Sequence, residues 1–160
     1  MKGATDTEFL PEKELTRGMF AAMLARMSGE NFDEYTKGKF DDVNSEMYYA
    51  NPVNWAVDKG IITGYDEKTF APDDNITREQ AVVMIYRYAQ YMKIGDDEWK
   101  DTNILSYDDF GEISEWAISS MQWNVGAGII KGRTESTIAP TDNITRAEIA
   151  QMIMNFSEIK

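Results

Sequence analysis

Apolar residues recur at helical spacing in three similar stretches of the chain, which follow Arg17, Arg78 and Arg146. The second stretch, AVVMIYRYAQYM from Ala81, is apolar on more than one face. A helix with this pattern is typically buried on several sides. The pattern therefore predicts three long helices that bury one another around a shared axis, which no single copy could do alone.

Each of these helices closes a block of 25 residues that occurs three times without a gap, from Gly3, Gly64 and Gly132. Each block holds a Gly, an aromatic or aliphatic residue, a Pro, another aliphatic residue, Thr-Arg and the helix, all in register. A repeat of this length fixes the architecture before any motif is interpreted. It also triplicates any binding site that the block carries.

The start of each long helix carries a Thr at the N-cap position. A capping box adds Glu or Gln three residues later, so that the two side chains satisfy each other's backbone N–H groups. The complete boxes are Thr77 with Gln80, and Thr145 with Glu148. In the first copy Met19 stands three residues after Thr16, in place of Glu or Gln, so only the Thr half of the box is present.

A shorter helix precedes the second and third blocks. In the second it starts near Asn51 and Pro52 and ends before Gly60, because Pro suits the first helical position and Gly the position past the end. In the third, Trp123 aligns with Trp55 on a mostly apolar face. This face comprises Ile113, Trp116, Ala117, Ser120, Met121 and Trp123. We predict that Trp116 lies in the core.

The composition of the chain excludes several classes of site and partner. The chain has 160 residues, a net charge of −12, and neither Cys nor His. Catalytic sites and metal sites built on His or thiolates are therefore excluded, and we expect no cofactor. Nucleic acid is a poor partner for so acidic a chain. No apolar run is long enough to span a bilayer.

Several ordered motifs resemble the surface-layer homology domain. They are F-D-D-V from Phe40, W-A-V-x-x-G-I-I-x-G-Y from Trp55, T-F-x-P from Thr69, I-T-R-E from Ile76 and T-R-A-E from Thr145. The resemblance implies a mainly α, pseudo-threefold unit, with a central three-helix bundle, helix–turn prongs and only short extended segments. It divides residues 1–160, read as one unit, into the C-terminal half of a first motif (1–29), a second motif (30–93) and a third (94–160).

The resemblance also implies a site and a location. Domains of this family anchor exported bacterial proteins to secondary cell-wall polysaccharides, often pyruvylated, which bind in grooves between motifs. We therefore expect a non-catalytic module at the bacterial cell surface, with any export signal upstream of residue 1. The expected ligand-binding residues are Arg17, Arg78, Arg146, Asp42, Asp109, Trp55, Trp123, Thr77 and Thr145. At Asp109 the motif F-D-D-V becomes D-D-F-G, and the two Trp residues also suit the core.

The chemistry of the repeated Arg supports a site independently of the family. An Arg at the first helical position opposes the helix dipole, at about 0.3–1 kcal/mol, so an anion should lie nearby. Free N–H groups at a helix start and a guanidinium fork together match a carboxylate. That carboxylate could belong to a ligand such as a pyruvate ketal, or to the chain itself at Asp41, Asp42 or Glu79. Both readings stay open.

Two other functions compete with polysaccharide anchoring. One is a protein–protein assembly module of the bacterial surface, and the other is a glycan-processing enzyme. The first motif lacks its Trp-bearing helix, which predicts exposed apolar surface at Phe9, Phe20 and Leu24 and self-association of the chain.

Overall fold

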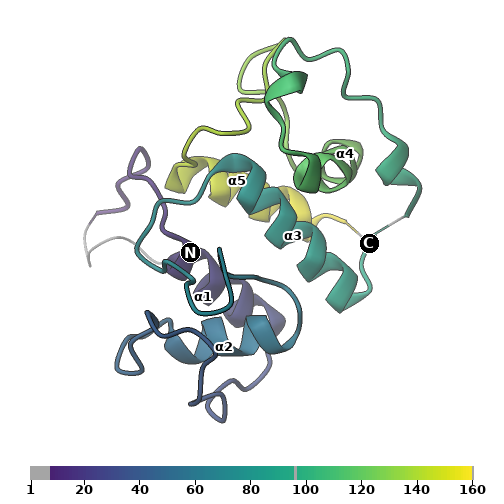
Figure 1. The fold of residues 1–160 in the computed structure, drawn as a ribbon. Coiled ribbons are helices and arrows are strands. Elements are labelled where there is room, and N and C mark those ends of the chain that lie inside the picture. The colour runs from purple at the N-terminus through teal and green to yellow at the C-terminus, as the bar shows by residue number, and fades with distance from the viewer. Residues whose placement is uncertain (1–7, 96, 160) are drawn as a thin grey trace. The chain divides into compact units, whose positions relative to one another are not determined.

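The computed structural model describes residues 8–95 and 97–159 and is mainly α-helical (Figure 1). In these residues the ordered elements are five α-helices and three short 3-10 helices. Extended pairing in the same residues is limited to isolated bridges. The prediction of a mainly α protein with short extended segments is confirmed.

Residues Leu15–Asn75 form one compact unit. It contains α1 (Arg17–Ser28) and α2 (Ala50–Asp58), which pack against each other. Trp55 of α2 is fully buried, and its indole N–H donates to Glu30 just past the end of α1. The core of this unit therefore lies between α1 and α2.

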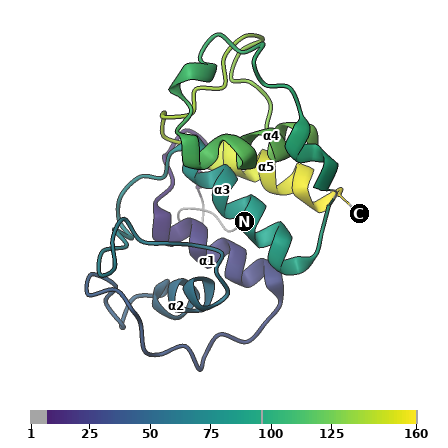
Figure 2. The ribbon, with the colours of Figure 1, turned by 45° about the vertical axis from the view of Figure 1, so that its right-hand side comes forward.

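Residues Met1–Glu14 and Ile76–Lys160 form the second unit. It holds α3 (Arg78–Met92), the 3-10 helices η1 (Asp97–Asp101), η2 (Phe110–Glu112) and η3 (Glu115–Ala117), then α4 (Ile118–Gly126) and α5 (Arg146–Ser157). Helix α4 packs on α3 as α2 packs on α1, and both views show α4 beside α3 (Figure 2). Each packed pair thus joins the long helix of one motif to the short helix of the next.

The long helices begin where the capping motifs predict. Thr77 and Thr145 are N-caps with complete capping boxes, whereas the Thr16 side chain accepts from Met19 N–H without a reciprocal bond. Gly60 and Gly128 follow the short helices with φ of 69° and 70°, a conformation that favours Gly. Pro52 is the third residue of α2, so it lies in the first turn but not at the first position.

Two predictions about exposure are wrong. Trp116 is 57% exposed, because it lies in the 3-10 helix η3 before α4 starts, whereas Ile113 and Ala117 are buried as predicted. Phe20 and Leu24 are fully buried, although Phe9 is 39% exposed as expected.

Candidate functional site

The repeated Arg binds a loop of another repeat in all three copies. The guanidinium Nε–H of Arg17 donates to Phe70 O at 2.9 Å, that of Arg78 to Ile138 O at 2.8 Å, and that of Arg146 to Phe9 O at 2.9 Å. The three acceptors occupy the same position of the 25-residue block. The Arg thus joins one motif to the next, and the third motif to the first.

Backbone bonds complete each of these junctions. Arg17 N–H donates to Asp74 O and Gly18 N–H to Pro72 O, at 2.9 and 2.8 Å. The same two bonds recur at the starts of α3 and α5. The third N–H of each helix donates to the Thr N-cap. These donors are occupied by the protein, so the free helix N–H groups that we expected to meet a carboxylate are not available.

The acceptor loops share an unusual backbone conformation. The residue before the loop Pro has a positive φ in every copy, at 50° for Leu10, 56° for Ala71 and 53° for Ala139. A residue with a Cβ takes this left-handed conformation at a cost of roughly 1–2 kcal/mol. A loop that keeps the conformation three times must be held by specific contacts.

The predicted Asp residues provide these contacts in two copies. The Asp42 carboxylate accepts from Phe70 N–H and from Ala71 N–H, the latter at 2.6 Å. Asp109 accepts from Ile138 and Ala139 N–H groups at 2.9 and 2.6 Å. The two carboxylates are therefore equivalent, and each pins a left-handed loop next to the Arg.

The register around Asp109 is clearer in the structure than in the sequence. Asp41 N–H donates to Lys68 O, and Asp108 N–H makes the matching bond to Ser136 O. The tetrad equivalent to F-D-D-V is consequently the one that starts at Tyr107, and not D-D-F-G. The aromatic residue in front of the Asp pair is conserved in type between these two repeats, which is the signal that the sequence comparison missed.

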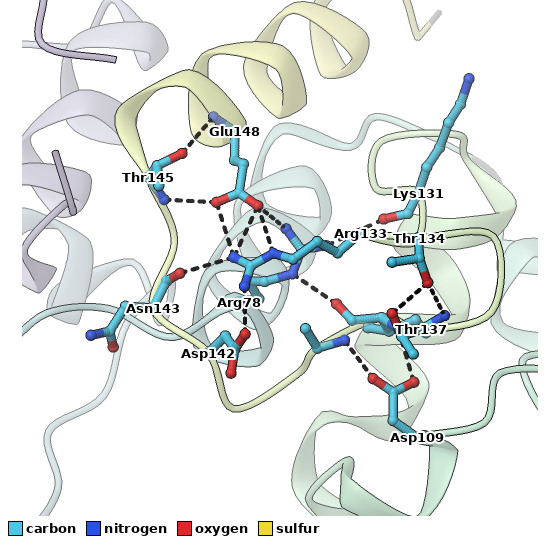
Figure 3. A network of polar contacts seen from close by, with 12 residues as sticks. Arg78, Asp109, Lys131, Arg133, Thr134, Thr137, Asp142, Asn143, Thr145 and Glu148 are labelled. Atoms are coloured by element: carbon cyan, nitrogen blue, oxygen red, sulfur yellow. Dashed lines mark hydrogen bonds and ion pairs between the residues drawn. The ribbon is translucent and has the colours of Figure 1, made fainter. Parts of the chain in front are cut away.

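The junction around Arg78 contains an ion-pair network (Figure 3). Arg78 Nη1 lies 2.9 Å from Glu148 Oε1, and Arg133 Nη2 lies 3.0 Å from the same oxygen. Arg133 also pairs with Asp142. Arg78 Nη2 reaches Lys131 O at 3.2 Å. Two cations and two carboxylates meet here, so the network is neutral.

Burial and pairing oppose each other in the pKa values of this network. Burial lowers the pKa of Arg78, while Glu148 acts to raise it. Burial alone would raise the pKa of Glu148, but the Thr145 N–H, Arg133 and Arg78 together hold it below the ordinary value. Glu148 is therefore ionised at neutral pH. It is the internal carboxylate for Arg78, in place of Asp41, Asp42 or Glu79.

The Arg17 junction has a different composition. Its guanidinium lies over the rings of Tyr65 and Phe70, 4.4 and 4.7 Å from their centroids. Nη2 donates to Thr63 O at 3.1 Å. Within the described residues, no carboxylate lies at ion-pair distance from Arg17. Burial lowers the pKa of its guanidinium, while Tyr65, Asp74 and Asp42 act to raise it. Tyr65 is the residue of the second block that corresponds to Arg133 in the third block, and its side chain is 53% exposed.

The Arg146 junction resembles that of Arg17 in its aromatic partner. The Arg146 guanidinium lies 5.0 Å from the centroid of the Phe9 ring. All three Arg residues are buried, at 5%, 3% and 7% exposure in chain order. Glu148 of the third motif corresponds to Gln80 in the second motif and to Met19 in the first. Only the third motif therefore carries an acidic residue at this position.

The remaining predicted residues have structural contacts. Trp55 and Trp123 are fully buried, so neither exposes a ring face to a sugar, and their place is the core. The Thr77 and Thr145 hydroxyls accept from their own helices. Exposed aromatic side chains instead occur at Tyr48 (51%), in the second motif, and at Trp116, in the third.

Tyr48 and Trp116 are separated by the same offset as Trp55 and Trp123, so they are equivalent positions. Each stands near the start of a short helix. Ser114, two residues before Trp116, donates from its N–H and its hydroxyl to Glu79, the neighbour of Arg78, at 3.0 Å each. The sequence carried a signal for this exposed pair, because Tyr48 and Trp116 are aromatic residues at the same position of two repeats.

No helix among the described residues is long and apolar enough to cross a membrane, and no cluster of potential metal ligands occurs among them.

The model of the S-layer homology domain family matches residues 39–82 and 106–150. The chain belongs to the S-layer homology domain family. The match falls on the second and third motifs and includes Asp42, Arg78, Asp109 and Arg146.

Relatives of this S-layer homology chain are large proteins. An amylopullulanase of Thermoanaerobacterium thermosulfurigenes is 36% identical over 99% of the chain, which covers 8% of that protein. Exoglucanase XynX of Acetivibrio thermocellus is 34% identical over 99% of the chain, or 14% of its own length. A cellulosome-anchoring protein of the same species is 29% identical over 96% of the chain, or 34% of its length. The chain thus corresponds to a small part of each relative.

Proposed function

We propose that this S-layer homology chain is a non-catalytic module that anchors a protein at the bacterial cell surface by binding an anionic cell-wall polysaccharide. The names of several relatives, a cellulosome-anchoring protein and two surface-layer proteins, support anchoring at the cell surface. The enzymes among the relatives are far longer than the matched part, so their activities need not reside in it.

The observation that carries the proposal is that Arg17 has no ion-pair partner among the described residues. Its carbonyl partners position the guanidinium without neutralising it, and the described residues place no carboxylate at ion-pair distance. A guanidinium in a partly dry site forms strong charge-assisted hydrogen bonds with a carboxylate. An acidic substituent of a wall sugar, such as a pyruvate ketal, would supply that carboxylate locally, despite the net charge of −12.

Exposed aromatic rings supply the second element of a sugar site. Tyr65 is both in contact with Arg17 and half exposed, so its ring can pack against a sugar while the guanidinium holds the acid. We assign the same packing role to Tyr48 and Trp116 in their motifs. Asp42 and Asp109 act indirectly, because their carboxylates fix the loops whose carbonyl groups orient the arginines.

Co-sedimentation with purified wall fragments tests this function. The chain should pellet with fragments that carry a pyruvylated polysaccharide, and stay in solution with fragments from which the polysaccharide has been stripped. The Arg17→Gln variant should lose binding, while Lys37→Gln, at an exposed loop position of the same unit, should keep it. Equal pelleting with stripped fragments would instead favour a protein–protein assembly module.

A further inference from the structure

Every nitrogen of the Arg78 guanidinium already has a partner in the chain. Nε–H donates to Ile138 O at 2.8 Å, Nη2 to Lys131 O at 3.2 Å, and Nη1 to the Glu148 carboxylate at 2.9 Å. The Arg17 guanidinium makes the matching pair of bonds to backbone carbonyl groups, but it has no ion-pair partner among the described residues. The carboxylate of Glu148 is therefore what distinguishes the two junctions.

Glu148 is held as a bound carboxylate ligand would be. Its Oε1 accepts from Arg78 Nη1 at 2.9 Å and from Arg133 Nη2 at 3.0 Å, while Oε2 accepts from Thr145 N–H at 2.8 Å (Figure 3). Guanidinium groups and N–H groups at a helix start are donors that suit a carboxylate. Glu148 thus has, within the chain, the kind of partners that the acid group of a ligand would seek.

Arg133 is the more exposed of the two cations that bind Glu148. Its side chain is 35% exposed, against 4% for Arg78. Its Nη1 pairs with Asp142, Nη2 donates to Asn143 O at 3.2 Å, and Nε donates to Glu148 Oε1 at 3.2 Å. Each nitrogen of Arg133 therefore has a protein partner as well, and the second cation is committed to the same network.

A ligand carboxylate at this junction would have to displace Glu148 from both cations. The displaced carboxylate would remain beside the incoming one, and two carboxylates that share a site disfavour each other's ionised form. Attachment to the chain also gives Glu148 a high effective concentration at the two arginines. Glu148 is therefore a strong competitor for any acidic ligand at Arg78.

The second block differs from the third at both positions of this closure. Tyr65 stands in the second block where Arg133 stands in the third. Gln80 stands where Glu148 does. The Tyr65 ring lies 4.4 Å from the Arg17 guanidinium and is half exposed. A ring face supplies no carboxylate, so an ion-pair partner for Arg17 can come from a ligand.

We propose that Glu148, held in place by Arg133, is a built-in occupant of the Arg78 junction that excludes acidic sugars from it. The identity of the excluded ligand rests on the proposed function, whereas the occupancy of Arg78 rests on the contacts of Glu148. Glu148 is thereby a specificity-determining residue, because it decides whether Arg78 can accept a carboxylate from outside the chain.

Removal of Glu148 should give the chain a new site. In the Arg17→Gln background, Glu148→Ala should strengthen binding of pyruvylated wall polysaccharide about tenfold or more in isothermal titration, the usual worth of one hydrogen bond to a charged group. Arg17→Gln with Glu135→Ala is the matched control, because it removes the same charge at an exposed loop position and should restore nothing. Adding Arg78→Gln to the restored variant should abolish the gain. Glu148→Gln, which keeps the cap as Gln80 does in α3, should act in the same direction.

The NMR signal of Arg78 Nε–H reports the occupancy of this junction without reference to Arg17. During titration with the methyl glycoside of a pyruvylated sugar, this signal should stay in place in the wild type and shift in Glu148→Gln. A shift in the wild type, or a folded Arg17→Gln, Glu148→Ala variant that binds no better than its control, would overturn the proposal. Wild-type affinity in Arg17→Gln would instead contradict the proposed function, and the Arg78 signal would still decide whether Glu148 closes the junction.

Discussion

The Nη1 atom of Arg78 lies 2.9 Å from Oε1 of Glu148, so the carboxylate that caps α5 also neutralises the first residue of α3. The other oxygen, Oε2, accepts from Thr145 N–H at 2.8 Å. One side chain thereby serves helix capping in the third motif and charge compensation in the second. The two roles can be separated, because Gln80 caps α3 with a neutral amide.

Glu148→Gln should keep the cap and remove the charge. We expect a loss of about 1–2 kcal/mol in the free energy of unfolding, less than for a fully buried pair because the Glu148 side chain is 27% exposed. Urea unfolding followed by circular dichroism measures this loss. Glu135→Gln, at an exposed loop position, serves as the control and should unfold with the wild-type midpoint.

The same residue gives the stability a pH dependence. Because the folded pKa of Glu148 lies below its unfolded value of 4.5, its contribution is complete above that value and is lost as pH falls through the folded pKa. The urea midpoint of the wild type should therefore drop below about pH 4.5 more steeply than that of Glu148→Gln. Parallel curves for the two proteins would remove Glu148 from the account of acid stability.

Asp42→Ala should destabilise the residue 15–75 unit by about 1.5–3 kcal/mol, the usual worth of hydrogen bonds to a charged group. The change leaves the N–H groups of Phe70 and Ala71 without their acceptor in a loop with positive φ. Asp41→Asn is the matched control, because its ion pair with Lys68 is exposed and such pairs contribute little. Thermal unfolding of both variants decides whether the loop depends on Asp42.

The sequence predicted features that depend on residues nearby in the chain better than features that depend on residues far away in it. Capping boxes and Gly stops were predictable, because Thr77, Thr145 and Gly60 act within a few residues of the chain. Trp55 and Trp123 were expected to bind ligand, with the core as the alternative, and their full burial favours the core. Helical periodicity failed at Trp116, because this residue lies in the 3-10 helix η3 before α4 starts.

The candidate site was predicted in its residues but not in its contacts. The arginines were found from the repeat and the Asp residues from the family resemblance, yet their partners are carbonyl and amide groups of loops up to 137 residues away. Helix N–H groups that seem free in a sequence are occupied by Pro72 and Asp74 carbonyl groups. Local patterns do not encode which distant backbone satisfies a helix end.

Substitutions at the buried Trp123 and at the exposed Trp116 should separate effects on stability from effects on polysaccharide binding. Trp123→Ala should cost about 3–5 kcal/mol, as for other fully buried aromatic residues, and lower Tm strongly. Trp116→Ala should leave Tm nearly unchanged and weaken binding to wall polysaccharide, because its ring is 57% exposed. Thermal scans and polysaccharide titrations of both variants give the comparison. Undiminished binding by Trp116→Ala would remove that ring from the site.

The central claim is that the guanidinium of Arg17, which has no ion-pair partner among the described residues, recognises the acid group of a wall polysaccharide. Isothermal titration of the chain with purified pyruvylated polysaccharide, and with the same polymer after removal of its pyruvate, tests this most directly. We predict saturable binding of the pyruvylated polymer alone, lost in Arg17→Gln and retained in Lys37→Gln, a variant at an exposed loop position, with both variants folded by circular dichroism. Equal affinity for the two polymers, or full affinity in a folded Arg17→Gln variant, would contradict the account.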